Sequence, residues 1–316
     1  SGWSDRWVQL PLGLWAASMP WLVAFGLRNL SQVAIRLAAI ATAATPILYT
    51  TNFTENGWAD LTNAGTSSSM MLGGGSDLAV MCMLTLSATL FLRATSSNCK
   101  RLAICAGVAL AATAAMKNEG LALLMVSMIA CAAALIFKNR PLRIIGFFAA
   151  STIICVAPWL GIRAQIPAID ENYSEQLTLQ NVMHFAGGAN ELVEKSPLAM
   201  SGRPQMDEGS IPTRRSLVAE AFVDEFFDMR SWGLLWVLAL ISVGLVVKNS
   251  ESFNYRWLTL VIVGGVLLYF LILLVTPWNF PSLRDKGIPE RLLVHLVGPI
   301  MLLLGHALSS IEAEDC

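Results

Sequence analysis

Four adjacent residues, Lys117-Asn118-Glu119-Gly120, interrupt two apolar runs and suggest chemistry. The flanking runs, Leu102–Met116 and Leu121–Phe137, are rich in Ala, Leu, Val and Ile. A charge at the centre of a lipid-spanning helix costs about 2.5–3.5 kcal/mol, so the pair is expected at a helix end or facing a polar cavity. We predict the tip of a helical hairpin that forms a polar site for an anionic, membrane-embedded ligand. The structural alternative is a self-neutralising turn in which Lys117 balances Glu119 and Gly120 eases the bend.

Further charged residues near the expected helix ends could join this site. Asp77 follows Gly73-Gly74-Gly75-Ser76. Its carboxylate either faces the same cavity as Lys117 or is stabilised there by the positive end of a helix dipole. Positive charge is concentrated near the last apolar run, at Arg284, Lys286 and Arg291. These side chains either contact a ligand or are ordinary interfacial residues.

The three histidines are interpreted as polar residues without a ligand role. His295 lies one turn beyond Arg291, His306 lies near the far end of the same run, and His184 belongs to a long hydrophilic segment. A single histidine on an apolar helix is more often packed than ligating. No glycine-rich phosphate loop, zinc motif or nucleophile elbow occurs in the sequence.

Composition identifies the elements that must position these residues. The chain of 316 residues is 55% hydrophobic and 14% charged, with a mean hydropathy of +0.59, which indicates an integral membrane protein. Since it lacks the alternating segments of an outer-membrane barrel, we predict an all-α, polytopic transmembrane bundle of about nine spans. The runs are Val8–Leu27, Gln32–Tyr49, Met70–Leu92, Leu102–Met116, Leu121–Phe137, Leu142–Ile162, Ser231–Val247, Trp257–Thr276 and Leu292–Ser309.

The basic residues predict the orientation of the bundle. Ten of them lie in the connections at 28–36, 93–101, 138–143 and 248–256, against five in the short connections on the other side, so the ten mark the cytoplasmic face. Ser1, Lys117, the loop 163–230 and Arg291 are then outside. The chain divides into transmembrane helices at 1–162, an outer loop at 163–230, and the last three helices with a cytoplasmic tail at 231–316.

The composition of the outer loop, residues 163–230, predicts a lid of short helices. The loop holds six basic and eleven acidic residues between Arg163 and Arg230 and is broken up by Gly and Pro. Within it, Arg214–Met229 places Leu217, Val218, Ala221, Phe222 and Phe226 on one helical face, which is typical of a helix on the bilayer surface. The six cysteines show no metal-ligand spacing and are interpreted as small packing residues.

An outside amino terminus without a preceding signal, together with Ser1 in place of Met, favours a fragment. We expect one amino-terminal helix and its outward loop to be missing.

Several short motifs occur in an order that resembles a known family. They are Lys-Asn-Glu-Gly at 117–120, Ala-Pro-Trp-Leu at 157–160, Trp-Gly-Leu-Leu-Trp at 232–236, Val-Thr-Pro-Trp at 275–278 and Glu-Arg-Leu-Leu-Val-His-Leu at 290–296. Over roughly 8–309 the chain resembles the bacterial GT-C membrane glycosyltransferases related to protein O-mannosyltransferases and lipid A aminoarabinose transferases.

The resemblance implies transfer of a sugar from a polyprenyl-phosphate donor to a lipid, glycan or protein acceptor at the outer leaflet of the cell (inner) membrane. Lys117 and Arg291 would contact the donor phosphate, with Glu119 and Arg284 in support. The main catalytic carboxylate is expected in the missing segment, so the fragment alone would be inactive; Asp60, Asp77 and Glu119 are the candidates in hand. No metal, cofactor or nucleic acid is implied.

Two other classes of function remain open. A transporter or lipid flippase also uses charged residues at broken helices, but it predicts internal repeats and charges near mid-membrane. A non-catalytic membrane assembly subunit is the second alternative.

Overall fold

The apolar runs of the sequence form helices, because a backbone in lipid must satisfy its hydrogen bonds within one segment. The computed structural model describes residues 6–45, 77–136, 141–165, 178–186, 214–249, 253–275 and 287–314, and these residues are helical or lie in turns between helices. The elements are α1 (Arg6–Leu27), α2 (Gln32–Ala43), α3 (Asp77–Ser97), α4 (Lys100–Met116), α5 (Asn118–Ala134), α6 (Leu142–Arg163), α8 (Leu179–Ala186), α10 (Arg214–Phe227), α11 (Met229–Trp232), α12 (Leu235–Asn249), α13 (Phe253–Val275), α15 (Gly287–Leu293), the 3-10 helix η4 (Val294–Leu296) and α16 (Val297–Glu314).

Four helical segments within the described ranges are long and apolar enough to cross a membrane. They are α3, α6, α13 and the continuous stretch Pro289–Ile311, which confirms the prediction of an all-helical membrane protein. Each of the nine predicted apolar runs contains a helix in the described part of the chain, but α1, α2, α5 and α12 contribute only shorter apolar segments.

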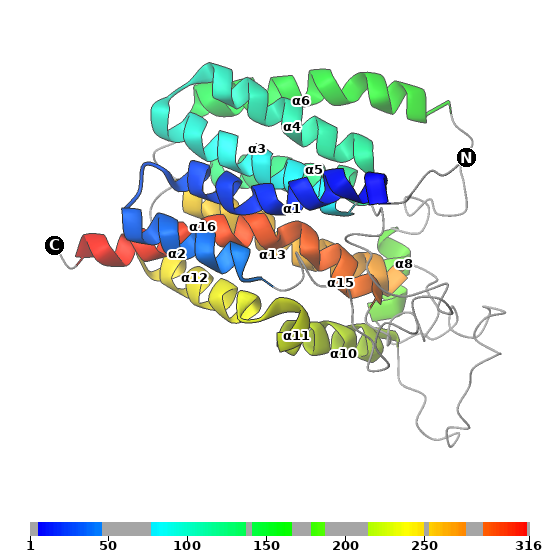
Figure 1. The fold of residues 1–316 in the computed structure, drawn as a ribbon. Helices are drawn as coiled ribbons and strands as arrows, with labels where there is room; N and C mark the ends of the chain where they lie inside the picture. The colour runs from blue at the N-terminus through cyan, green and yellow to red at the C-terminus, as the bar shows by residue number, and fades with distance from the viewer. Residues whose placement is uncertain are drawn as a thin grey trace.

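The helices lie side by side, with their ends gathered at two opposite ends of the bundle (Figure 1). The stretch Pro289–Ile311 is central: 89% of its apolar window is buried, and α16 contacts α1, α2, α3, α12 and α13. Helix α6 is peripheral, since only 28% of its window is buried and its main neighbour is α4. A central helix thus leads directly into the charged residues at its start.

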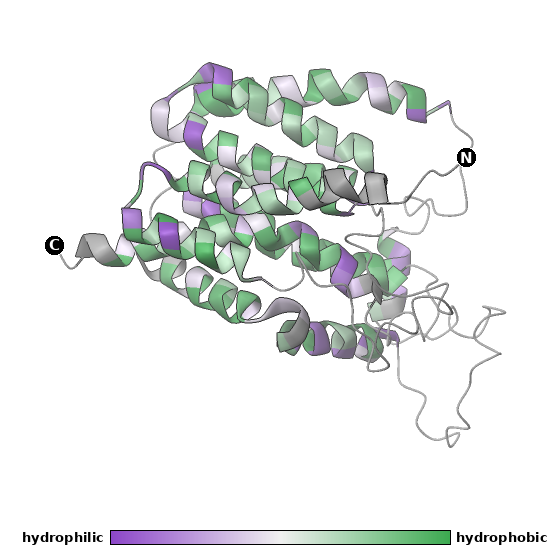
Figure 2. Cartoon of the chain, in the orientation of Figure 1, coloured by the Kyte–Doolittle hydropathy of each residue, from purple (hydrophilic) through white to green (hydrophobic). Residues whose placement is uncertain are grey.

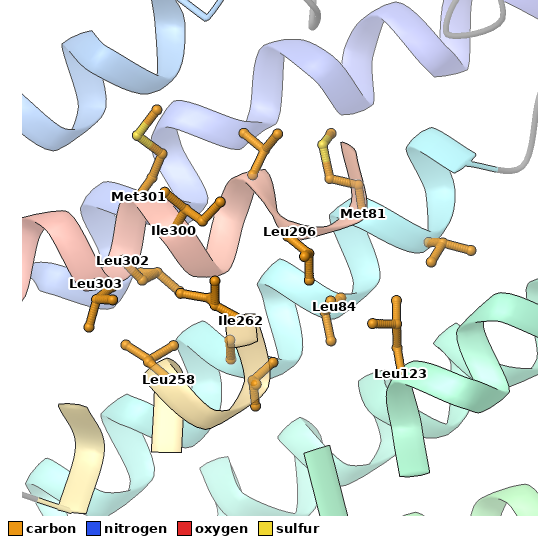
Figure 3. Close-up of a cluster of buried hydrophobic side chains, with 14 of the residues drawn as sticks. Met81, Leu84, Leu123, Leu258, Ile262, Leu296, Ile300, Met301, Leu302 and Leu303 are labelled. Atoms are coloured by element: carbon orange, nitrogen blue, oxygen red, sulfur yellow. The ribbon is translucent and has the colours of Figure 1, made fainter. Parts of the chain in front are cut away.

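Aliphatic side chains from α3, α5, α13, η4 and α16 form the core next to this central helix (Figure 3). Met81 and Leu84 of α3 belong to the same cluster as Leu296 of η4 and Ile300 and Met301 of α16 (Figure 3). Threonines within the core bond back to their own helix: the Thr85 hydroxyl donates to the Met81 carbonyl at 2.7 Å. Such bonds satisfy hydroxyl groups inside an apolar bundle without a partner from another helix.

Hydrophilic residues concentrate at the two ends of the bundle and on α10 (Figure 2). One end carries Asp77, Lys117 and Arg291, and the opposite end carries Arg28, Arg93 and Arg143 (Figure 1). The predicted hairpin is present, because α4 ends at Met116 and α5 begins at Asn118 and the two helices pack together.

Helix α10 differs from its prediction as a helix that lies on the bilayer surface. Its predicted apolar face is correct, since Val218, Ala221 and Phe222 are buried, but that face packs on protein. The Phe222 ring meets Phe270 of α13 at a centroid distance of 5.6 Å. The opposite face exposes Val223 and Phe227. The loop therefore contributes a helix to the bundle core as well as to its surface.

Two of the predicted spans are interrupted. The run Ser231–Val247 breaks at Gly233, whose positive φ of 56° ends α11 before α12 begins. The run Leu292–Ser309 changes from α-helix to the 3-10 helix η4 at Val294–Leu296, the turn that holds His295. Neither break was predicted, although Gly233 lies in the first run and Gly298-Pro299 follows the 3-10 turn in the second.

Candidate functional site

The carboxylate of Asp77 is the centre of a cluster of charged residues at one end of the bundle. Asp77 is the first residue of α3 and its side chain is 1% exposed. One oxygen, Oδ1, accepts from Lys117 Nζ at 2.6 Å and lies 3.2 Å from His295 Nε2. The other oxygen, Oδ2, accepts from Arg291 Nε at 2.9 Å. A buried carboxylate with three charged or polar donors is satisfied on both oxygens.

Lys117 reaches this carboxylate from the single residue that separates α4 and α5. Its backbone is extended, with φ −161° and ψ 156°, so the chain turns between the two helices within one residue. Glu119 lies in the first turn of α5, where the helix dipole favours a carboxylate, and its Oε1 is 3.4 Å from Lys117 Nζ. Lys117 therefore lies between two carboxylates rather than pairing with Glu119 alone.

Gly120 allows α4 and α5 to approach closely at this tip. A Cβ atom at this position would lie 2.0 Å from the carbonyl oxygen of Thr113, which is a backbone atom of α4 and cannot move aside. The residue therefore permits close contact of the two helices, and its φ is not positive. The expectation that Gly120 eases the bend is replaced by this packing role.

A second glycine holds the other half of the cluster against α3. A Cβ atom at Gly298, early in α16, would lie 1.8 Å from Thr85 Oγ1. This close contact lies two turns along α3 from Asp77 and one turn along the chain from His295. The approach of α16 to α3 thus brings Arg291 and His295 within reach of the carboxylate.

His295 connects Asp77 to the hydroxyl group of Tyr269 on α13. The imidazole is 0% exposed, and its Nδ1 lies 2.7 Å from the Tyr269 oxygen. Since ionised Asp77 can only accept, Nε2 carries a proton and donates to it. In this neutral tautomer, Nδ1 accepts a hydrogen bond from the Tyr269 hydroxyl. Both ring nitrogens of His295 and the Tyr269 hydroxyl then have hydrogen-bond partners.

The cations of the cluster retain access to solvent, whereas the anions lie beneath them. The side chains of Lys117 and Arg291 are 20% and 32% exposed, against 1% for Asp77 and 9% for Glu119. Arg291 uses only Nε toward Asp77, and within the described ranges no other hydrogen bond to its guanidinium is found. Its terminal nitrogens are therefore donors available to an anion outside the cluster.

Arg214 fixes the end of α13 that carries Tyr269. Its Nε and Nη2 atoms donate to the carbonyl oxygens of Leu274 and Leu273 at 2.9 and 2.8 Å. These carbonyls belong to the last turn of α13, which lacks helical partners for them. Burial lowers the pKa of the Arg214 guanidinium to about 10, so it stays charged at neutral pH.

The structure brings together most of the residues that the sequence singled out. Lys117, Arg291, Asp77 and Glu119 form one cluster, whereas Asp60 and Arg284 lie outside the described residues. His295 was interpreted as a packed polar residue without a role, yet it bonds to Asp77. Its position four residues after Arg291 was the available signal, since residues so spaced share a helix face. Tyr269, inside an apolar run, gave no such signal.

Comparison of the chain with protein-family models, with curated proteins and with solved structures gives no match. In the described part of the chain, no group of three or more His, Cys, Asp or Glu side chains has the arrangement of a metal site.

Proposed function

We propose that this chain is a membrane glycosyltransferase that uses a polyprenyl-phosphate-linked sugar as its donor. The observation that carries the proposal is the meeting of Lys117 and Arg291 at Asp77, with their outer sides open to solvent. These two residues were predicted from sequence as donor-phosphate contacts although 174 positions separate them. The proposal includes a GT-C bundle of about nine spans in the cell membrane, with this cluster at the outer leaflet.

In the proposed reaction, an acceptor hydroxyl attacks the anomeric carbon of the sugar. The bond between that carbon and the phosphate oxygen breaks, and the electron pair leaves with the phosphate. Fixed cations in a partly dehydrated site stabilise the charge that develops on this leaving group. Lys117 and Arg291 have this role. The acceptor proton passes to a carboxylate, for which Asp60 and Glu119 remain candidates.

Asp77 has a different role in this proposal. With an exposed fraction of 1% and both oxygens occupied, it is a positioning residue that holds Lys117 and Arg291 side by side. A substrate phosphodiester adds one negative charge to a cluster that contains two cations and two carboxylates. Glu119 is the farther of the two acidic partners of Lys117, at 3.4 Å, so its contact is the weaker one when the phosphate binds.

The position of the cluster supports an enzyme over a transporter. A transporter site is expected near mid-membrane between related halves of the chain. Here Asp77 begins α3, Lys117 separates α4 from α5 and Arg291 lies in α15, so the charges lie at helix ends.

A second candidate function is a non-catalytic assembly subunit, in which these ion pairs only join helices. The observation that favours it is that the charges of the cluster neutralise one another.

The first test is binding of a polyprenyl phosphate to the purified chain in lipid nanodiscs. The second is transfer of a radiolabelled sugar from the corresponding donor, measured with the full-length protein that carries this chain. We expect Lys117→Gln and Arg291→Gln each to weaken transfer on the order of 100-fold to 1000-fold. Arg163→Gln is the matched control, because Arg163 lies at the same end of the bundle against Trp159, with its Cζ 5.1 Å from the ring centre.

Two outcomes would count against the enzyme. If wild type, Lys117→Gln and Arg291→Gln bind polyprenyl phosphate equally, then Lys117 and Arg291 do not form a phosphate site. The second outcome is near-normal transfer by the double variant Lys117→Met with Glu119→Leu, provided that it inserts into the membrane as well as wild type. That result would mean that Lys117 only neutralises Glu119 and does not bind the donor.

A further inference from the structure

Two arginines at the end of the bundle opposite the Asp77 cluster share one aromatic ring. The Cζ atom of Arg28 lies 5.1 Å from the centre of the Phe25 ring, and that of Arg93 lies 5.5 Å from it. Arg28 and Phe25 belong to α1 and its end, whereas Arg93 belongs to α3. Like charges are thus held around one ring by two different helices.

In the described part of the chain, no carboxylate balances the charge of this pair, since none forms an ion pair with either guanidinium. Arg93 is 4% exposed, its Nη1 donates to Asn29 Oδ1 at 2.6 Å, and its Nε is enclosed without a hydrogen-bond partner. A buried charge without a counter-ion is costly, so an anion bound beside this pair would be stabilised by both guanidinium groups.

The surroundings of the pair indicate which anion it is. Leu14, Trp21 and Phe25 are exposed, with exposed fractions of 61%, 79% and 39%, and Arg28 follows at the end of the same helix face. Spacings of seven, four and three residues place these side chains in one stripe along α1. A lipid has the same order of groups, since its apolar acyl chain would lie along the stripe and its phosphate would reach the guanidinium. A soluble anion would contact the guanidinium alone.

We propose that Arg28 and Arg93, beside Phe25, bind the phosphate group of an anionic phospholipid in the leaflet at this end of the bundle. The lipid's acyl chain lies along the exposed stripe of α1. Its phosphate supplies the counter-charge that the described residues lack and ties α1 to α3. The site is separate from the Asp77 cluster and does not depend on sugar transfer.

Native mass spectrometry of the full chain, with phosphatidylglycerol or phosphatidylcholine added to the micelle, tests this site. Replacing one charged donor removes a charge-assisted hydrogen bond, so Arg28→Gln and Arg93→Gln should each weaken phosphatidylglycerol binding about tenfold. Arg93→Lys keeps the charge and should retain part of the affinity. Phosphatidylcholine, which carries no net charge, should bind equally to all variants.

Arg143→Gln is the matched control, since Arg143 is exposed at the same end of the bundle and its Cζ lies 6.0 Å from the Phe147 ring centre. It lies beside a ring without a second arginine, and its loss should leave binding unchanged. Because Arg28 is exposed, Arg28→Gln does not threaten folding and keeps the test decisive. Unchanged phosphatidylglycerol binding in Arg28→Gln would overturn the proposal. Displacement of the lipid by inorganic phosphate would assign the site to a soluble anion and would also overturn it.

Discussion

Replacing Asp77 with Asn is the sharpest perturbation of the charged cluster. The substitution keeps the shape of the side chain but removes the charge that pairs with Lys117 and Arg291. It also places an amide N–H₂ group where one of the two oxygens accepted a hydrogen bond. If Oδ1 continues to accept from Lys117 and His295, the new donor faces the donating Nε of Arg291.

The size of the effect follows from the burial of the partners. Removing one member of a buried ion pair costs about 3–5 kcal/mol. Lys117 and Arg291 are 20% and 32% exposed, so both regain hydration when Asp77 is neutralised. Lys117 also keeps Glu119 at 3.4 Å. We therefore expect the lower end of the range, a loss of about 3 kcal/mol in the free energy of unfolding.

Equilibrium unfolding in mixed micelles measures this loss. Asp224→Asn is the control, because Asp224 is an exposed acid on α10. A double-mutant cycle of Asp77→Asn with Lys117→Gln should give a coupling energy of at least about 1 kcal/mol, as expected for residues in one network. A loss below about 1 kcal/mol for Asp77→Asn would be the value typical of surface ion pairs and would refute the reasoning.

Three further predictions concern the hairpin, the buried histidine and the topology. Gly120→Ala should destabilise the protein by about 2–3 kcal/mol in the same unfolding assay, because its Cβ would meet the Thr113 carbonyl. Gly146→Ala, which has open space around it, should be neutral or slightly stabilising, and equal effects would contradict the packing role of Gly120. Tyr269→Phe removes the donor to His295 Nδ1 and should cost about 1–3 kcal/mol; an unchanged stability would mean that this bond contributes nothing. A cysteine placed at position 205 should react with a membrane-impermeant maleimide added from outside, whereas one at position 250 should not, and the reverse pattern would invert the topology.

The sequence predicted the helices well because their apolar runs are long and their ends are marked by charge. It predicted that Lys117 and Arg291 could share one cavity, since both lie at helix ends on the same side of the bundle. It did not predict that Asp77 would hold both. That depends on the approach of α16 to α3 through Gly298 and on the 3-10 turn at His295, and the sequence pattern does not show which helix α16 approaches. The face of α10 was correct, but its partner was not, because an amphipathic pattern does not distinguish lipid from protein.

The cluster at Asp77 also imposes an order on biosynthesis. Lys117 follows Asp77 by 40 positions, whereas Arg291 and His295 follow it by 214 and 218. At about 5–20 residues per second, roughly 9–35 s separate the synthesis of Lys117 from that of Arg291. During this interval Lys117 is the only one of these three partners of Asp77 that has been made. The arrival of α15 and α16 then supplies both the second cation and the central helix of the bundle, so only a chain translated through its last helices has a finished site.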